Sequence, residues 1–210
     1  MDILCEISQK LQQGRAKDIR ALVAQALDDG ISAQDVLTKG LLDGMNTVGV
    51  KFKNNEIFVP EVLIAARAMN AGTEILKPYL SAQGVEPVGR VILGTVKGDM
   101  HDIGKNLVKM MLEGKGLDVI DLGVDVPAED FVAAAKENDA GVICCSALLT
   151  TTMNEMKSVV ELCKKEGIRD KVKIMVGGAP ITDAFCAEIG ADAYTSDAAS
   201  CAEVARAYFD

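Results

Sequence analysis

Residues 90–106 read RVILGTVKGDMHDIGKN, and this stretch decides the fold class of the chain around it. A strand-like apolar run over 90–96 leads into a loop, and a helical pattern covers 104–115. The same succession recurs four more times, with apolar runs over 118–123, 141–147, 172–176 and 193–195 and helical patterns over 127–138, 153–166, 181–189 and 198–208. Alternating strands and helices predict an α/β domain with a five-stranded parallel sheet covered on both faces.

Five such units fit the flavodoxin-like, Rossmann-like strand order 2-1-3-4-5. In open sheets of this kind, ligands bind beyond the carboxyl ends of the strands, at the point where the order reverses. Here that point lies between the strands over 90–96 and 141–147. We therefore expect the chemistry in the loops that follow Val96 and Cys145.

The chain before residue 81 has a different texture, with helical periodicity and no strand-like runs. Four helices are expected, over 2–13, 15–29, 33–52 and 60–80. Ser32 and Asp35 form a capping start, and Pro60 suits a first helical position. Short connections indicate a four-helix bundle. The Gly- and Pro-containing segment 81–89 then separates two predicted domains, 1–84 and 88–210.

Composition and charge exclude several classes of protein. The net charge is −9, with 9 basic and 10 acidic residues in 1–84 and 13 and 21 in the remainder, and an acidic sheet domain argues against nucleic acid. No apolar run approaches the ~18 residues of a membrane span, and no signal peptide is evident. Six cysteines without a C-x-x-C pair fit a reducing cytoplasm.

The loop after 90–96 holds the single histidine of the chain, His101, close to Asp99 and Asp102. Imidazole is the commonest metal ligand, and a carboxylate two residues earlier can fix its tautomer. A solvated histidine on a surface loop fits this segment equally well. A phosphate-binding P-loop does not fit, because five residues separate Gly98 from Gly104.

Two further loops carry features that suit a ligand. The segment after 141–147 offers four hydroxyls in seven residues, from Ser146 to Thr152, whereas helix capping would need one. The run over 172–176 ends in Gly177-Gly178, which permits either a tight turn or close approach by a ligand.

Three motifs together resemble the signature of cobalamin-binding domains that bind with His on and base off: Asp99-x-His101-x-x-Gly104, Ser146-x-Leu148 and Gly177-Gly178. Residues 44–49 and 52–69 resemble the helical cap module of methionine synthase and of corrinoid proteins from methanol and methylamine methyltransferases. The resemblance covers nearly the whole chain. It implies a helical cap domain over 1–84 and a corrinoid-binding α/β domain over 88–210.

The resemblance also implies roles for individual residues. His101 would ligate the cobalt of a cobamide from below, Asp99 would hydrogen-bond it, and Thr152 would be the third member of this relay, where methionine synthase has serine. Further implied cofactor contacts are Met100, Asp102, Ile103, Gly104 and Leu148, together with the tail-binding residues Ser146, Thr150, Gly177 and Gly178. Phe52, Val59 and Val62 would cover the upper corrin face, whereas without the resemblance the pattern of these residues favours plain bundle core.

The implied function is a methyl carrier that works between a substrate-specific methyltransferase and an acceptor methyltransferase, with a reductive activation protein as a further partner. No segment is left to bind the methyl donor or acceptor, so the chain is not expected to turn over alone. A cobamide-binding mutase subunit and a cobalamin-sensing regulator are the alternatives. The mutase subunits lack such a cap, and the regulators carry a basic DNA-binding domain.

Overall fold

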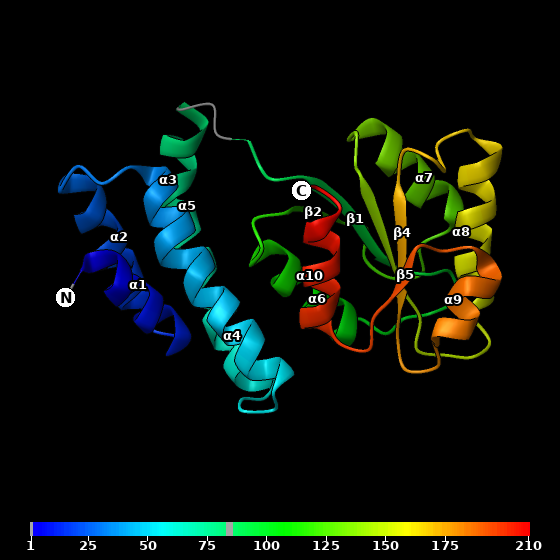
Figure 1. Cartoon of the computed structure of the whole chain (residues 1–210), viewed down its shortest axis with the longest axis horizontal. Helices are drawn as coiled ribbons and strands as arrows, with labels where there is room; N and C mark the ends of the chain where they lie inside the picture. Colours follow the sequence, from blue (N-terminus) through cyan, green and yellow to red (C-terminus); the bar gives the residue numbers. More distant parts are fainter. Residues whose placement is uncertain (1, 83–85) are drawn as a thin grey trace. The chain divides into compact units, whose positions relative to one another are not determined.

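The computed structural model describes residues 2–82 and 86–210 of the chain. It contains two compact units, Met1–Glu86 and Pro87–Asp210 (Figure 1). Residues 83–85 of the segment expected to act as a linker lie outside the described residues. No helix in the described part of the chain has both the length and the apolar character that crossing a membrane requires.

The first unit is helical. Its elements are α1 (Ile3–Gln12), α2 (Ala16–Asp28), α3 (Ala33–Asp35), η1 (Val36–Leu42), α4 (Asp43–Lys53) and α5 (Val59–Ala82). Because α3, η1 and α4 follow one another without a break, they correspond to the single helix expected over 33–52, and the predicted four-helix arrangement is confirmed. The Ser32 hydroxyl accepts a hydrogen bond from the Asp35 N–H at 3.0 Å, as its capping role requires.

The π-helical segment η1 is the main local difference from the predicted helix. The sequence did not predict it, because π-helical turns are rare and have no distinct pattern of residues in this segment. Close helix packing surrounds this segment. A Cβ added to Gly40 would lie 3.0 Å from Ile7, and one added to Gly72 of α5 would lie 2.9 Å from Leu41. Glycine at these two positions therefore lets the neighbouring helices approach.

The second unit is a doubly wound sheet. Its strands are β1 (Arg90–Thr95), β2 (Asp118–Asp121), β3 (Val142–Ser146), β4 (Lys173–Gly177) and β5 (Ala193–Tyr194). Its helices are α6 (Ile103–Glu113), α7 (Ala128–Glu137), α8 (Asn154–Lys165), α9 (Asp183–Ile189) and α10 (Ala198–Ala207). All pairings are parallel in the order β2-β1-β3-β4-β5, which confirms the predicted topology.

Helices cover both faces of this sheet, with α6 and α10 on one face and α7, α8 and α9 on the other (Figure 1). Ile92, Ile143 and Ile174 come from three adjacent strands and pack with α7, α8 and α9 in one buried cluster. Phe131 of α7 is fully buried in it, and a Cβ on Gly94 would lie 2.7 Å from the Phe131 ring. Burial on both faces explains why the strands read as continuous apolar runs.

The register of the sheet sets the position of the loops that matter for function. Thr95 at the end of β1 lies opposite Ser146 at the end of β3, and Ser146 lies opposite Gly177 at the end of β4. The loops after these three strands therefore start side by side along the carboxyl edge of the sheet.

Gly178 makes the tightest backbone approach at this edge. Its φ is +131°, and a Cβ there would lie 1.8 Å from the Ala147 carbonyl oxygen. The neighbouring Gly177 is different, because a Cβ there would come no closer than 3.8 Å to the Thr195 carbonyl oxygen. Gly178 is therefore required by the fold, whereas Gly177 leaves room beside the strand end.

We predict that Gly178→Ala lowers the free energy of unfolding by about 3 kcal/mol, because an alanine adds both a backbone clash and an unfavourable φ. Gly177→Ala is the matched control and should change stability by less than about 1 kcal/mol. Urea denaturation of both variants and the parent protein measures these values. Equal stability of the two variants would contradict the packing described for Gly178.

Candidate functional site

The loop between β1 and α6 begins with a tight turn. The Asp99 N–H donates to the Val96 carbonyl at 3.1 Å, and Gly98 has a φ of +81°. These values match a type II turn, which requires a positive φ at its third residue. The turn places the Asp99 side chain in a fully buried position at the carboxyl edge of the sheet.

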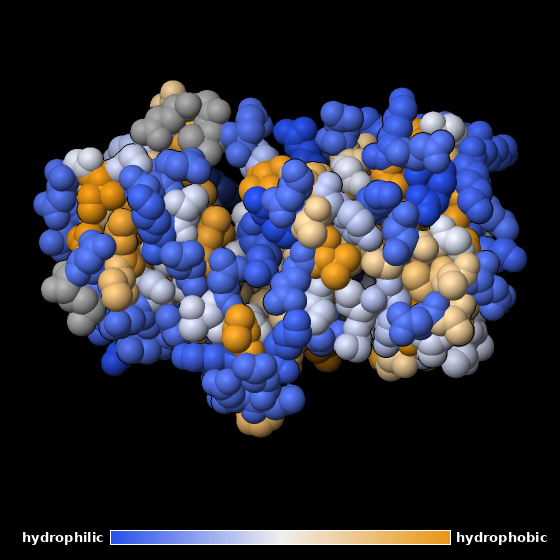
Figure 2. Space-filling view, in the orientation of Figure 1, coloured by the Kyte–Doolittle hydropathy of each residue, from blue (hydrophilic) through white to orange (hydrophobic). Residues whose placement is uncertain are grey.

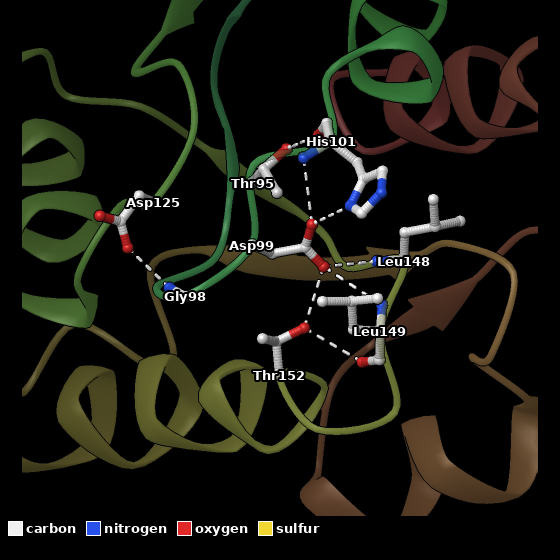
Figure 3. A network of polar contacts seen from close by, with 8 residues as sticks. All are labelled: Thr95, Gly98, Asp99, His101, Asp125, Leu148, Leu149 and Thr152. Carbon is white, nitrogen blue, oxygen red and sulfur yellow. Dashed lines mark hydrogen bonds and ion pairs between the residues drawn. The ribbon is translucent and has the colours of Figure 1, made fainter.

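The Asp99 carboxylate is the centre of a hydrogen-bond network (Figure 3). Its Oδ1 accepts from the His101 N–H at 3.1 Å and lies 2.7 Å from His101 Nδ1. Its Oδ2 accepts from the N–H groups of Leu148 and Leu149 at 2.8 and 3.2 Å. Oδ2 also accepts from the Thr152 hydroxyl at 2.9 Å. One buried carboxylate thus joins the loop after β1 to the loop after β3.

These contacts keep Asp99 ionised. Burial by itself would raise the pKa of Asp99, but the hydrogen bonds from His101, Leu148 and Thr152 outweigh it and hold the pKa well below its ordinary value. An ionised carboxylate can only accept hydrogen bonds. His101 Nδ1 must therefore carry the proton in this contact.

His101 is held on one side and open on the other. Half of its side chain is exposed, and Nδ1 is engaged by Asp99. Nε2 lies on the far side of the ring, directed away from Asp99 (Figure 3). With the proton on Nδ1, a neutral ring presents its lone pair at Nε2, which is the arrangement of a histidine that ligates a metal.

Thr95 is a part of this site that the sequence did not single out. It is fully buried at the end of β1, and its hydroxyl donates to the His101 carbonyl oxygen at 2.8 Å. This bond fixes the main chain of His101, whereas Asp99 fixes its ring. A hydroxyl that ends an otherwise apolar strand was the only signal in the sequence.

A buried ion pair anchors the helix that follows the loop. Lys105 of α6 is 3% exposed, and its Nζ lies 2.7 and 2.8 Å from the two carboxylate oxygens of Asp121. Burial would raise the pKa of Asp121, but the hydrogen bond from Lys105 and that from the Gly123 N–H lower it overall. The pair ties the first turn of α6 to the end of β2.

Exposed apolar side chains occur near His101 in the chain, up to the first residue of α6, and in the loop after β3. Met100 and Ile103 are 69% and 77% exposed, and Leu148 and Leu149 are 44% and 40% exposed. The face drawn in Figure 2 carries hydrophobic patches between hydrophilic areas. Within the described part of the sheet domain, the four residues named here are the exposed large apolar residues at this edge. They suit a large apolar ligand that meets His101 at Nε2.

The remaining residues expected to contact the cofactor lie along the same edge or in the first turn of α6. Ser146 ends β3, and Thr150 is exposed in the loop that follows. Asp102 accepts from the Asn106 side chain at 3.1 Å, and a Cβ on Gly104 would meet nothing within 4 Å. The surface around Gly104 is therefore open.

The three residues expected to cover the upper corrin face belong to the first unit. Phe52 of α4 and Val59 of α5 are half-buried, and Val62 is fully buried. Val62 is therefore a core residue, whereas Phe52 and Val59 retain accessible surface. Within residues 2–82 and 86–210, no group of three or more His, Cys, Asp or Glu side chains is arranged to hold a metal ion.

Comparison with known proteins agrees with this site. Family models described as "B12 binding domain" match residues 89–203 and 3–77. The dimethylamine corrinoid protein 3 of Methanosarcina acetivorans is 46% identical over 176 residues, which cover 84% of this chain and 83% of that protein. The dimethylamine corrinoid protein of Methanosarcina barkeri is 44% identical over 199 residues, with coverages of 94% and 92%.

Solved structures show the same relationship. The methanol:cobalamin methyltransferase complex of Methanosarcina barkeri contains a chain that matches with a TM-score of 0.89 at 30% identity, covering 99% of this chain and 80% of that one. A cobalamin-binding protein from Desulfitobacterium hafniense matches with a TM-score of 0.81 at 30% identity, with coverages of 99% and 98%.

Fold, site and relatives together define a cobalamin-binding protein with an N-terminal helical module. More particularly, the chain belongs to the corrinoid protein family that includes the dimethylamine corrinoid proteins, and it binds a cobamide.

We predict that Asp99→Asn makes the free energy of unfolding less dependent on pH in the acid range. Because the folded-state pKa of Asp99 is lowered, its contribution is complete above its unfolded pKa of about 4 and is lost as the pH falls toward the folded value. The difference in unfolding free energy between parent and variant should therefore be about 2–4 kcal/mol at pH 6 and clearly smaller at pH 3. Urea denaturation at both pH values measures it. A difference that does not change with pH would show that Asp99 is not an ionised acceptor of these hydrogen bonds.

Proposed function

We propose that this protein carries a methyl group on the cobalt of its cobamide, bound with His on and base off. The observation that carries the proposal is the half-exposed His101 ring. Its Nδ1 lies 2.7 Å from a buried carboxylate oxygen, and its Nε2 points away from Asp99. Met100 and Ile103, which are close to His101 in the chain, are exposed. The names of the relatives, corrinoid proteins and a methanol:cobalamin methyltransferase complex, support the same function.

The donor set fits a corrin. A corrin ring supplies four nitrogens to its metal, so one protein ligand completes the lower face, and His101 Nε2 is the candidate. Met100, Ile103 and Leu148 offer exposed apolar surface for the ring. Asp102 and Gly104 also stay proposed contacts, because they begin the open first turn of α6.

The nucleotide tail is proposed to lie at the ends of β3 and β4. Ser146 and Thr150 would supply hydroxyls. Gly177, which lies opposite Ser146 in the sheet, would line the slot for the tail. The fold requires Gly178 to have no side chain, and its exposed backbone would line the same slot. The two ends of the cofactor would thus be held by neighbouring loops after β1, β3 and β4.

When bound, the cobamide supplies a cobalt that accepts a methyl group and gives it up. The chain adjusts how strongly His101 donates to that metal. The negative charge of Asp99 at Nδ1 increases electron donation from Nε2. The Thr152 hydroxyl, 2.9 Å from Asp99 Oδ2, withdraws part of that charge. Asp99, His101 and Thr152 would therefore act as one electronic unit.

The helical unit is proposed as a cap for the reactive face of the cofactor. Phe52 and Val59 have accessible surface that suits this role. Val62 would act by supporting them from the core, because it is fully buried. The support for this role is the resemblance of residues 44–69 to methyltransferase cap modules and the family match over 3–77.

The proposed partners are a substrate-specific methyltransferase, an acceptor methyltransferase and a reductive activation protein. The first has direct support, because the similar chain of Methanosarcina barkeri occurs in a complex with a methyltransferase. The other two follow from the chemistry of a carrier, which must unload its methyl group and be reduced again after oxidation. The proposed compartment is the cytoplasm, because the six cysteines of the chain are free thiols and five of them are buried.

The test of cobalt ligation is His101→Gly. The variant, reconstituted with a cobamide, should bind it and show a changed cobalt(III) spectrum, because the tail contacts remain while Nε2 is lost. Since the His101 side chain is half-exposed, added imidazole should enter the vacated position and restore the parent spectrum. Visible spectroscopy with and without imidazole measures both effects.

A variant spectrum identical to that of the parent would remove His101 as the ligand. Binding of the cobamide with its own base coordinated to cobalt in the parent protein would have the same consequence.

Thr152→Val tests the electronic unit, with Thr152→Ser as the matched control that keeps the hydroxyl. Loss of the hydrogen bond to Asp99 should strengthen donation by His101 and favour the more oxidised cobalt. One hydrogen bond is worth about 1 kcal/mol. We therefore expect the midpoint potential of a one-electron cobalt couple to be lower by up to about 40 mV in the valine variant. The serine variant should have the value of the parent protein. Spectroelectrochemical titration decides. Equal potentials in all three proteins would exclude Thr152 from the unit.

A further inference from the structure

Asp125, in the turn after β2, makes two hydrogen bonds to the His101 loop. Its Oδ1 accepts from the Gly98 N–H at 2.6 Å, a bond drawn in Figure 3. Its own N–H donates to the Asp99 carbonyl oxygen at 3.0 Å. Asp125 therefore holds the main chain on both sides of the peptide that joins Gly98 to Asp99.

The backbone of Asp125 adopts an unfavourable conformation in order to make these contacts. Asp125 is exposed and has a φ of +56°, in the left-handed region that few residues other than glycine adopt. Val126 follows at once and donates to the Thr95 carbonyl at 3.0 Å. Glycine would satisfy the turn with less strain, but it has no carboxylate for Gly98.

The two ends of Asp99 are thus held from different strands. Its carboxylate is held from the β3 side by Leu148, Leu149 and Thr152. Its main chain is held from the β2 side by Asp125. If the β2 side is released, the turn at Gly98 can move and take the Asp99 carboxylate away from its position at His101 Nδ1.

We propose that Asp125 is a positioning residue for the lower cobalt ligand. Its hydrogen bonds to this loop go to Gly98 and Asp99. It acts by holding the Gly98–Asp99 turn so that Asp99 keeps the imidazole in its ligating orientation. This inference rests on the proposed His-on binding. Loss of Asp125 should lower the fraction of cobamide ligated by His101 while leaving the amount bound unchanged, because the tail contacts lie on β3 and β4.

Three variants separate this role from general stability. Asp125→Gly removes the carboxylate and accommodates the positive φ. Asp125→Asn keeps an acceptor oxygen and tolerates the left-handed region. Asp139→Gly is the matched control, because Asp139 is also exposed with a φ of +48° but precedes β3, at the opposite edge of the sheet.

Each full-length protein is reconstituted with a cobamide. The ratio of His-ligated to unligated cofactor is read from the cobalt(III) spectrum and from nitrogen hyperfine splitting in the cobalt(II) resonance. A charge-assisted but exposed hydrogen bond leads us to expect a ratio about three- to tenfold lower in Asp125→Gly. Asp125→Asn should lie closer to the parent, and Asp139→Gly should equal it.

Amide hydrogen exchange gives a readout without cofactor. Exchange of the Gly98 N–H should be about tenfold faster in Asp125→Gly than in the parent, and unchanged in Asp139→Gly. This measurement reports the hydrogen bond itself, whereas the spectra report its effect on ligation.

Different outcomes refute different statements. A parent protein without His ligation would refute the proposed function and, with it, the role of Asp125. A parent that shows His ligation together with an Asp125→Gly variant of equal ratio would overturn the role of Asp125 alone. An Asp139→Gly variant that loses ligation as strongly as Asp125→Gly, or an Asp125→Asn variant no better than Asp125→Gly, would also overturn it.

Discussion

The hydrogen bonds that converge on the buried Asp99 carboxylate are the interaction on which the site depends. A buried charge without partners would cost several kcal/mol. Here three backbone N–H groups, the Thr152 hydroxyl and the His101 ring compensate the charge. Because the partners come from two loops, the carboxylate can stay ionised only while the loops after β1 and β3 keep their relative position. Charge compensation and site geometry are therefore the same constraint.

The parallel sheet makes this constraint possible. Pairing of β1 with β3 sets Thr95 beside Ser146, so that the two loops leave the sheet together. The result is a division between a buried charge and an exposed reactive atom. Asp99 is inaccessible to solvent, whereas the His101 side chain is half-exposed and its Nε2 points away from Asp99. Both features suit the proposed role of His101, because a metal ligand needs an oriented ring and an accessible nitrogen.

The loop that carries His101 is supported by residues from more than one strand. Thr95 holds the main chain of His101 from β1, and Lys105 joins α6 to Asp121 of β2. Asp125, in the turn after β2, holds the turn at Gly98. This distribution explains how a single exposed histidine in a glycine-containing loop can keep a defined orientation. A fixed orientation also suits the proposed role of His101 as a ligand to a metal that changes oxidation state.

The sequence alone determined the succession of strands and helices, the strand order and the loop that holds His101, because these depend on local apolar patterns and on chain connectivity. The contact between Asp99 and His101 was also within its reach, since the two residues are two positions apart. The family resemblance had already implied Thr152 as a partner of Asp99. Only the tertiary structure decided that the N–H groups of Leu148 and Leu149 also donate to Asp99, and that Asp125 holds Gly98. These partners lie 27 or more residues apart along the chain, and their distances depend on strand register and loop conformation, which residue patterns do not encode.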